Sequence, residues 1–314
     1  MIQENFIKIY EKSFKKNWEL PALTDYSKGT TFSFADVAKE IARIHILFEE
    51  CQIRRGDKIA LIGKDSARWC IVYMAAVTYG AIIVPILQDF SPNDVHHIIN
   101  HSESVFLFVS DRIWDTLEEE MIEDVRGVFS LSDFRCLHQR DGESIQKLLK
   151  GMDEKMAEKY PDGFGKDDIE YAELDNDKVV LLNYTSGTTS YSKGVMIPYR
   201  ALWSNTQFAF DVLKMNPGDK LVSMLPMAHM YGLAFEFLYE FCVGCHIYFL
   251  TRTPSPKIIF QAFSEVKPNL VVAVPLIIEK IIKKNVLPKL ETPAMKILLK
   301  VPIINDKIKA KVRE

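Results

Sequence analysis

Short apolar segments alternate with segments of helical character along most of this 314-residue chain. The apolar segments of the first half have the length of buried strands, and they span residues 58–63, 81–86 and 105–109. The helical segments around them span residues 33–51, 67–79 and 91–100. Strands that alternate with helices are typical of an α/β protein with a largely parallel sheet. We therefore expect an α/β fold in which helices pack on mostly parallel sheets.

The helix expected over residues 33–51 has the clearest local signal. Phe34, Val37 and Ile41 recur at helical spacing and define one apolar face. Ser33 precedes the first apolar residue, and Asp36 follows it by three positions. This spacing predicts an N-cap with the acidic half of a capping box.

Nineteen residues from Trp69 to Leu87 carry no charge, close to the roughly 20 that span a bilayer. Gly80 interrupts this run, and Pro85 lies within its second part. We therefore interpret it as a buried helix, residues 67–79, followed by a buried strand, residues 81–86, and not as a membrane span.

The segment from residue 138 to residue 178 is charged and acid-rich, and we interpret it as a connector that includes a surface helix over 144–159. We expect two α/β lobes, residues 1–170 with this connector and residues 171–314. The second lobe continues the alternation. Its expected strands are 179–184, 221–225, 246–250 and 270–274, and its expected helices are 199–213, 232–241, 256–266 and 275–284.

Charge and cysteine content exclude some classes of protein. The chain has 39 Lys and Arg and 42 Asp and Glu, which gives a net charge of −3. Because a nucleic-acid-binding protein needs a basic surface, this charge argues against that class. Five cysteines suggest no disulfide framework, and the charged first residues do not resemble a signal peptide. We expect a cytoplasmic protein. The stretch from Glu279 onward is basic, with ten Lys or Arg and four Asp or Glu. This basic stretch has two interpretations, attraction to anionic lipids at a membrane surface or a solvated helix surface.

The sharpest chemical signal is the polar loop expected over residues 185–194. It combines small hydroxyl residues with glycine and ends in a lysine, namely Thr185, Ser186, Gly187, Thr188, Thr189, Ser190, Lys193 and Gly194. Backbone N–H groups, hydroxyls and one mobile cation can converge on an anion, so a phosphate chain is the expected ligand. An ordinary Ser/Thr-rich surface turn is the alternative. The Walker pattern is excluded because Ser192 precedes the lysine and glycine follows it.

The loop sequence TSGTTSYSKGV resembles the signature of adenylate-forming enzymes, which include acyl-CoA synthetases, luciferases and peptide-synthetase adenylation domains. It departs from that family at Ser190 and Ser192, where glycine and proline are usual. Five further segments resemble family motifs in family order, FSFADV at 32–37, RGDKIA at 55–60, YGAIIVP at 79–85, LPMAHMYG at 225–232 and KPNLVVAVP at 267–275.

The resemblance implies an AMP-forming ligase that joins long-chain fatty acids to coenzyme A through an acyl-adenylate, with ATP and Mg²⁺. It implies catalytic roles for Lys193, His229 and Thr188, and nucleotide binding by the loop residues named above. His229, Tyr231 and Gly232 would contact the acyl substrate, and Thr188 would contact Mg²⁺. A buried core position is the alternative for His229, and core is the preferred interpretation of the apolar run 235–241.

The later family motifs, which carry the adenine, ribose and catalytic-lysine contacts, do not follow Pro275. We therefore expect an N-terminal fragment that is inactive alone. Two other functions stay open, an adenylating enzyme that loads a carrier-protein thiol and a non-catalytic nucleotide-binding module.

Two further patterns receive structural interpretations. Cys242, Cys245 and His246 spell a haem-attachment motif, but they lie in an apolar passage without an export signal. His96, His97 and His101 cluster on one expected helix, and we interpret them as partly exposed surface residues and not as a metal site.

Overall fold

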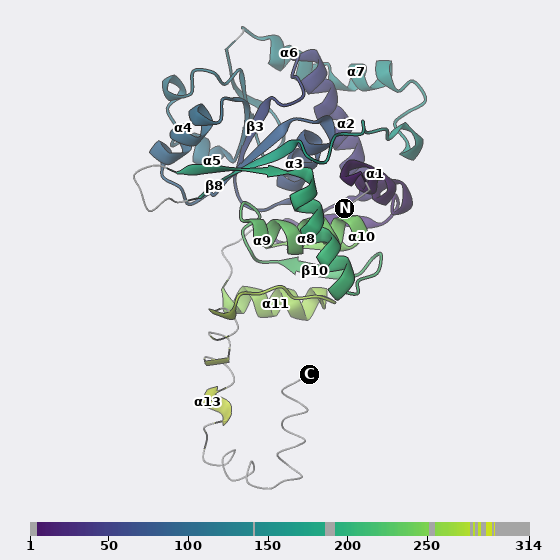
Figure 1. The fold of residues 1–314 in the computed structure, drawn as a ribbon, viewed down its shortest axis with the longest axis vertical. Coiled ribbons are helices and arrows are strands. Elements are labelled where there is room, and N and C mark those ends of the chain that lie inside the picture. The colour runs from purple at the N-terminus through teal and green to yellow at the C-terminus, as the bar shows by residue number, and fades with distance from the viewer. Residues whose placement is uncertain are drawn as a thin grey trace. The chain divides into compact units, whose positions relative to one another are not determined.

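A computed structural model describes residues 5–140, 142–185, 192–250, 255–276, 279, 282–283, 287–290 and 292 of the chain (Figure 1). The chain divides into two compact units, residues 1–271 and 272–314. Both sheets belong to the first unit. In the second unit the structure describes the short helix α13 (Leu287–Leu290) and residues 272–276, 279, 282–283 and 292.

The larger sheet has seven strands in the order β7-β6-β5-β3-β4-β8-β9. They are β3 (Lys58–Ile62), β4 (Ile82–Ile86), β5 (Ser104–Val109), β6 (Gly127–Ser130), β7 (Cys136–Gln139), β8 (Val179–Thr185) and β9 (Lys193–Pro198). The five inner strands are parallel, and β7 and β9 pair antiparallel with their neighbours. The inner strands therefore end at one common edge of the sheet, which we call the carboxyl edge.

The smaller sheet has four strands in the order β10-β11-β1-β2. They are β1 (Pro21–Asp25), β2 (Thr30–Ser33), β10 (Lys220–Ser223) and β11 (His246–Phe249). β10, β11 and β1 are parallel, and β2 returns antiparallel to β1. Both sheets are thus mostly parallel, which confirms the expected α/β class.

Helices pack against both sheets. The longer ones are α1 (Phe6–Lys16), α2 (Phe34–Glu50), α3 (Ala67–Tyr79), α4 (Pro92–His101), α8 (Tyr199–Val212) and α11 (Pro256–Val266). Shorter helices are α5 (Asp111–Trp114), α6 (Ser144–Lys150) and α7 (Met152–Lys159), with 3₁₀ turns η1 (Glu119–Met121) and η2 (Lys166–Asp168). Figure 1 shows α4 on one side of β3, with α2 and α3 on the other.

Two local predictions in the first half are confirmed. Ser33 caps α2, and the Asp36 side chain accepts from the Ser33 N–H at 2.8 Å, which completes the capping box. The uncharged run forms α3, whose side chains are almost all buried, followed by β4. Among the described residues, no helix is long and apolar enough to span a membrane.

The expected division at residue 170 does not coincide with the division between the sheets. β8 lies beyond that residue but pairs with β4, with Leu181 opposite Ile83. β1 lies before it but pairs with β11, with Leu23 opposite Ile247. The physical reason is that β8 is a mostly buried apolar strand, which needs strand neighbours, and β4 supplies one of them.

Part of the charged segment 138–178 packs against the larger sheet and α2. Its helix α6 contacts β7, its helix α7 lies beside α2, and ion pairs fasten α7 to α2. Arg43 binds Asp153 at 2.6 Å, and Lys159 binds Glu49 at 2.6 Å. The charges that suggested a connector are thus partly used to attach this segment to α2.

Three predictions differ from the structure in the second half. The helix expected over 232–241 is a longer helical run, α9 (Met230–Leu233), a π-helical turn η3 (Ala234–Leu238) and α10 (Tyr239–Val243). The strand expected over 270–274 is reduced to one bridge between Leu221 and Leu270. β9 includes the last two residues of the expected loop, Lys193 and Gly194. The helix expected over 275–284 and the basic stretch lie largely outside the described residues.

Candidate functional site at the carboxyl edge

The hairpin of β8 and β9 carries the two ends of the expected phosphate loop. The strands pair antiparallel, and this register places Lys193 directly opposite Thr185. Both side chains are exposed. Thr185 ends β8, and Lys193 and Gly194 begin β9, so all three are strand residues. The β-branched and apolar residues that follow Gly194 favour a strand that pairs with β8. Ser186, Gly187, Thr188, Thr189 and Ser190 lie outside the described residues.

Gly194 permits a close approach of the two strands of this hairpin. It lies opposite Tyr184, and a Cβ at this position would be 3.0 Å from the Tyr184 ring. The Tyr184 hydroxyl is fixed in turn by a hydrogen bond of 2.7 Å to His101 Nδ1. Burial of the ring raises the pKa of Tyr184. Gly194 thus has a packing role in the hairpin, whatever further contact its backbone makes with a ligand.

The second predicted motif, residues 225–232, follows β10 and turns into α9. We call it the His229 segment. The His229 side chain is exposed, and its backbone N–H donates to Pro226 O at 3.0 Å. Tyr231 is 49% exposed. The exposure of His229 rules out the alternative of a core histidine, whereas Phe237 and Phe241 are fully buried and confirm the core interpretation of the apolar run.

Gly232 is buried where the chain folds back on the start of the His229 segment. A Cβ at this position would lie 2.6 Å from Pro226 O, a distance that side-chain carbons do not adopt without backbone movement. The residue therefore has to be glycine for the segment to make this turn.

Asn183 joins the two motifs, and sequence reasoning did not find it. This buried side chain of β8 donates from Nδ2 to Ala228 O at 2.9 Å. The residue lies two positions before Thr185, and its acceptor lies one position before His229. The strand that leads into the phosphate loop and the His229 segment are therefore neighbours in space.

A buried carboxylate, Glu236, holds the start of the His229 segment. Its oxygens accept hydrogen bonds from Met224 N at 3.0 Å, from Leu225 N at 2.9 Å and from Ser223 Oγ at 2.9 Å. Glu236 is completely buried in the π-helical turn. This burial raises the pKa of Glu236 to about 8, although the three hydrogen bonds favour the ionised form.

Asp65 supports the middle of the same segment from the larger sheet. It follows β3, and its Oδ1 accepts from Met227 N at 3.2 Å. Burial raises the pKa of Asp65 to about 7. Asp65 and Glu236 also repel each other when ionised, which adds to the shift at Glu236. Neither acid belongs to a recognisable local pattern, so only the tertiary fold shows their role.

The histidine cluster on α4 differs in part from its prediction. His96 is 3% exposed, and its Nε2 accepts from Glu118 N at 3.0 Å. It is buried because the α5–η1 connection covers this face of the helix, and burial lowers its pKa. Among the described residues, no group of three or more His, Cys, Asp or Glu could hold a metal ion. Thr188, the expected Mg²⁺ contact, is outside that part of the chain.

Known proteins resemble this chain in sequence. The acyl-CoA ligase sidI of Aspergillus fumigatus is 26% identical over 274 residues, which cover 83% of this chain and 44% of that protein. The long-chain-fatty-acid–[acyl-carrier-protein] ligase AEE15 of Arabidopsis thaliana is 26% identical over 287 residues, which cover 86% of this chain and 38% of that protein. The chain thus spans less than half the length of these relatives.

A solved structure has the same fold. The N-terminal domain of FACL13 from Mycobacterium tuberculosis superimposes with a TM-score of 0.71 at 18% identity, covering 93% of this chain and 68% of that one. Residues 10–310 match the family model described as AMP-binding enzyme. Because this match extends over nearly the whole chain, the chain belongs to the AMP-binding enzyme family.

Proposed function

We propose that this protein is an AMP-forming acyl-CoA ligase that activates long-chain fatty acids with ATP. One observation carries the proposal. In the β8–β9 hairpin Lys193 lies opposite Thr185 at the carboxyl edge, and Asn183 of β8 forms a hydrogen bond with the His229 segment. Ligands of open α/β sheets bind at such strand ends, so a cation and an exposed histidine are available where a nucleotide and a carboxylate would meet.

Lys193 and the loop hydroxyls bind the phosphate chain of ATP in this proposal. The Lys193 ammonium group donates hydrogen bonds to phosphate oxygens, and the hydroxyls of Thr185, Ser186, Thr188, Thr189 and Ser190 add neutral donors. These donors stabilise the charge that develops on pyrophosphate when the fatty-acid carboxylate attacks the α-phosphate. Mg²⁺, held at Thr188, would supply further neutralisation of the phosphates.

The His229 segment binds the fatty-acid substrate of the same reaction. His229 orients the fatty-acid carboxylate, and Tyr231 and Gly232 shape the start of the acyl pocket. In the second step the thiol of coenzyme A attacks the acyl-adenylate carbonyl carbon, and AMP leaves with its phosphate oxygen. We propose that residues 1–314 alone complete neither step.

A carrier-protein thiol is the second candidate for the acyl acceptor. The Arabidopsis relative is named as a ligase for acyl-carrier protein, and the sidI relative is named as an acyl-CoA ligase. Both acceptors use the same adenylation step, so the residues described above do not distinguish them.

The test is product analysis with the complete gene product, ATP, fatty acids of increasing chain length and either coenzyme A or acyl-carrier protein. We expect acyl-CoA, pyrophosphate and AMP with long-chain acids, and loss of more than about 100-fold in rate for Lys193→Ala. Lys214→Ala, an exposed lysine after α8, is the matched control and should keep full activity.

Three outcomes would contradict the proposal in different ways. Acyl-carrier protein as the only acceptor would favour the second candidate. ATP binding without pyrophosphate release would favour a non-catalytic nucleotide-binding module. ATP–pyrophosphate exchange by residues 1–314 alone would show that this part completes the first step.

A further inference from the structure

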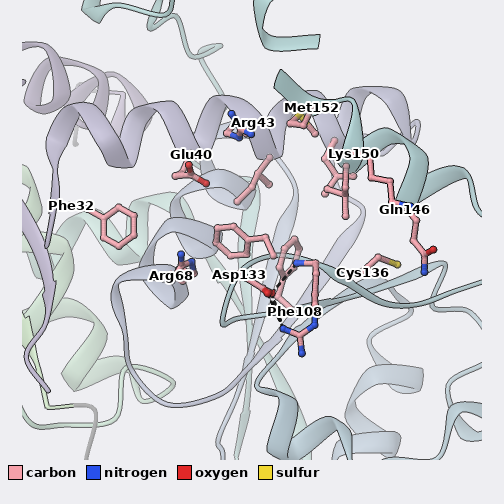
Figure 2. A pocket seen from close by; sticks show the side chains of 15 residues that line it. Phe32, Glu40, Arg43, Arg68, Phe108, Asp133, Cys136, Gln146, Lys150 and Met152 are labelled. Atoms are coloured by element: carbon pink, nitrogen blue, oxygen red, sulfur yellow. Dashed lines mark hydrogen bonds and ion pairs between the residues drawn. The ribbon is translucent and has the colours of Figure 1, made fainter. Parts of the chain in front are cut away.

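A pocket of about 510 Å³ lies on the α2 side of the larger sheet, away from the residues of the candidate functional site. α2, the start of α3, the end of β5, the turn between β6 and β7, and α6 enclose it (Figure 2). It shares no lining residue with the β8–β9 hairpin or the His229 segment. Its volume falls within the range of small-molecule sites, about 300–1,000 Å³.

Apolar side chains form much of the wall. Ile44 and Leu47 project from α2, one helical turn apart, and Phe108 comes from β5. Leu149 and Met152 close the side formed by α6 and the start of α7. The pocket therefore offers an apolar body of moderate size a place to be removed from water.

Arg68, near the start of α3, is one of the cations that line this pocket (Figure 2). Its guanidinium lies over the rings of Phe32 and Phe134, at 5.6 Å and 5.7 Å from their centroids. Two cation–π contacts fix the group but leave its N–H donors unused. It makes no hydrogen bond or ion pair with any residue in the described part of the chain.

The other arginines of the pocket are already neutralised. Arg43 binds Asp153 at 2.6 Å, and Arg135 binds Asp133 at 2.9 Å and also Asp111. Arg68 thus stands out as the arginine with free donors.

Two lining charges besides Arg68 are without ion-pair partners among the described residues. Lys150 is an exposed cation at the end of α6. Glu40 is a partly buried carboxylate on α2, and burial raises its pKa against the opposing effect of Arg43 and Arg68. Two unpaired cations against one unpaired carboxylate leave an excess of positive charge beside an apolar wall.

We propose that this pocket binds a small amphiphilic carboxylate, with its head group on Arg68 and its apolar body against Ile44, Leu47 and Phe108. Arg68 supplies paired N–H donors that match a carboxylate, and its position over two aromatic rings means that little side-chain freedom is lost on binding. The pocket is a second ligand site, separate from the catalytic chemistry proposed above, and its occupancy needs neither ATP nor turnover.

Cys136 reports occupancy directly because it lines this pocket. Burial raises its pKa to about 11, so its alkylation is slow and can be followed at mildly alkaline pH by mass spectrometry. Decanoate is the probe, and decan-1-ol is the uncharged control of equal chain length. We expect decanoate to slow alkylation of Cys136 and not of Cys51, which lies outside the pocket, and decan-1-ol to protect much less.

Two variants with opposite expected effects on decanoate binding distinguish recognition of the head group from general apolar binding. Arg68→Gln should raise the decanoate concentration for half-protection about tenfold, the effect of a lost charge-assisted hydrogen bond. Glu40→Gln should lower that concentration, because it removes a carboxylate that would repel the carboxylate of decanoate. An unchanged Cys51 rate shows that each variant is folded. Equal protection by decan-1-ol, or protection unchanged in both variants, would overturn the proposal.

Discussion

The hairpin that carries Lys193 and the segment that carries His229 meet at the carboxyl edge, but different interactions hold them. β9 is the edge strand of the larger sheet, and its outer side chains are open, with Val195 48% and Met196 70% exposed. The His229 segment, in contrast, donates backbone hydrogen bonds to the buried side chain of Glu236 and the partly buried side chain of Asp65.

This difference separates two tasks within one site. A strand paired on one side opens locally at a low free energy, which suits the phosphate binding that we propose for this hairpin. A backbone held by two carboxyl groups keeps one conformation, which suits the role that we propose for His229 in orienting the substrate carboxylate. Substitutions that probe the two regions should therefore differ sharply in their effects.

The largest expected effect on stability concerns Glu236 and pH. Its folded-state pKa, about 8, lies above the usual value of 4.5, so the folded state binds the proton more tightly. The stabilisation from this carboxyl is complete below about pH 4.5 and is lost as the pH rises to about 8. Between these values it should fall by up to about 1.4 kcal/mol per pH unit.

Glu236→Gln should remove that contribution, so its free energy of unfolding should fall less than that of the wild type from pH 5 to pH 8. Denaturant unfolding at each pH measures it, with the exposed Glu19→Gln as the control. Parallel curves for the wild type and Glu236→Gln would show that this carboxyl has no raised pKa.

Gly232→Ala should destabilise the fold by about 3 kcal/mol, because its Cβ would meet Pro226 O at 2.6 Å and the backbone has to move. Gly165→Ala is the matched control, since its Cβ would have an ordinary contact of 3.7 Å. Thermal or denaturant unfolding gives both values. Equal stability of the two variants would mean that the turn adapts freely.

Asn183→Ala should cost about 1 kcal/mol and should loosen the His229 segment, because Ala228 O loses its donor. Hydrogen exchange of the amides in residues 225–229 checks this, and faster exchange is the expected result. The control is Asn205→Ala on the exposed face of α8. If exchange in the segment stays at the wild-type rate, the hydrogen bond does not link the two motifs.

Met196→Lys on β9 should change stability by less than about 0.5 kcal/mol, since the side chain is already in solvent. The same denaturant titration measures it. A loss as large as that of Gly232→Ala would show that the hairpin is packed as firmly as the His229 segment, and the comparison would fail.

Local patterns predicted the elements whose causes are local. The capping box of Ser33 and Asp36 begins α2 as expected, and Gly80 separates α3 from β4 with φ of 90°. The motif residues at 225–232 were also found in sequence, because they resemble a family pattern. These features depend on neighbours within a few residues.

Features that depend on distant residues were missed or misjudged. The pairing of β8 with β4 and of β1 with β11 joins segments far apart in the chain, so local patterns did not predict it. His96 was expected on the surface because the segment that covers it comes later in the chain. Asn183, Asp65 and Glu236 look like ordinary polar residues until the fold brings them to the His229 segment.

We propose above that the Lys193 hairpin binds the phosphate chain of a nucleotide. Calorimetric titration of the protein with MgATP tests it most directly, with Lys193→Ala beside the control Lys214→Ala. We expect equal affinity for the wild type and Lys214→Ala, and affinity at least about tenfold weaker for Lys193→Ala. Unchanged affinity in Lys193→Ala, or no binding of MgATP by the wild type, would contradict it.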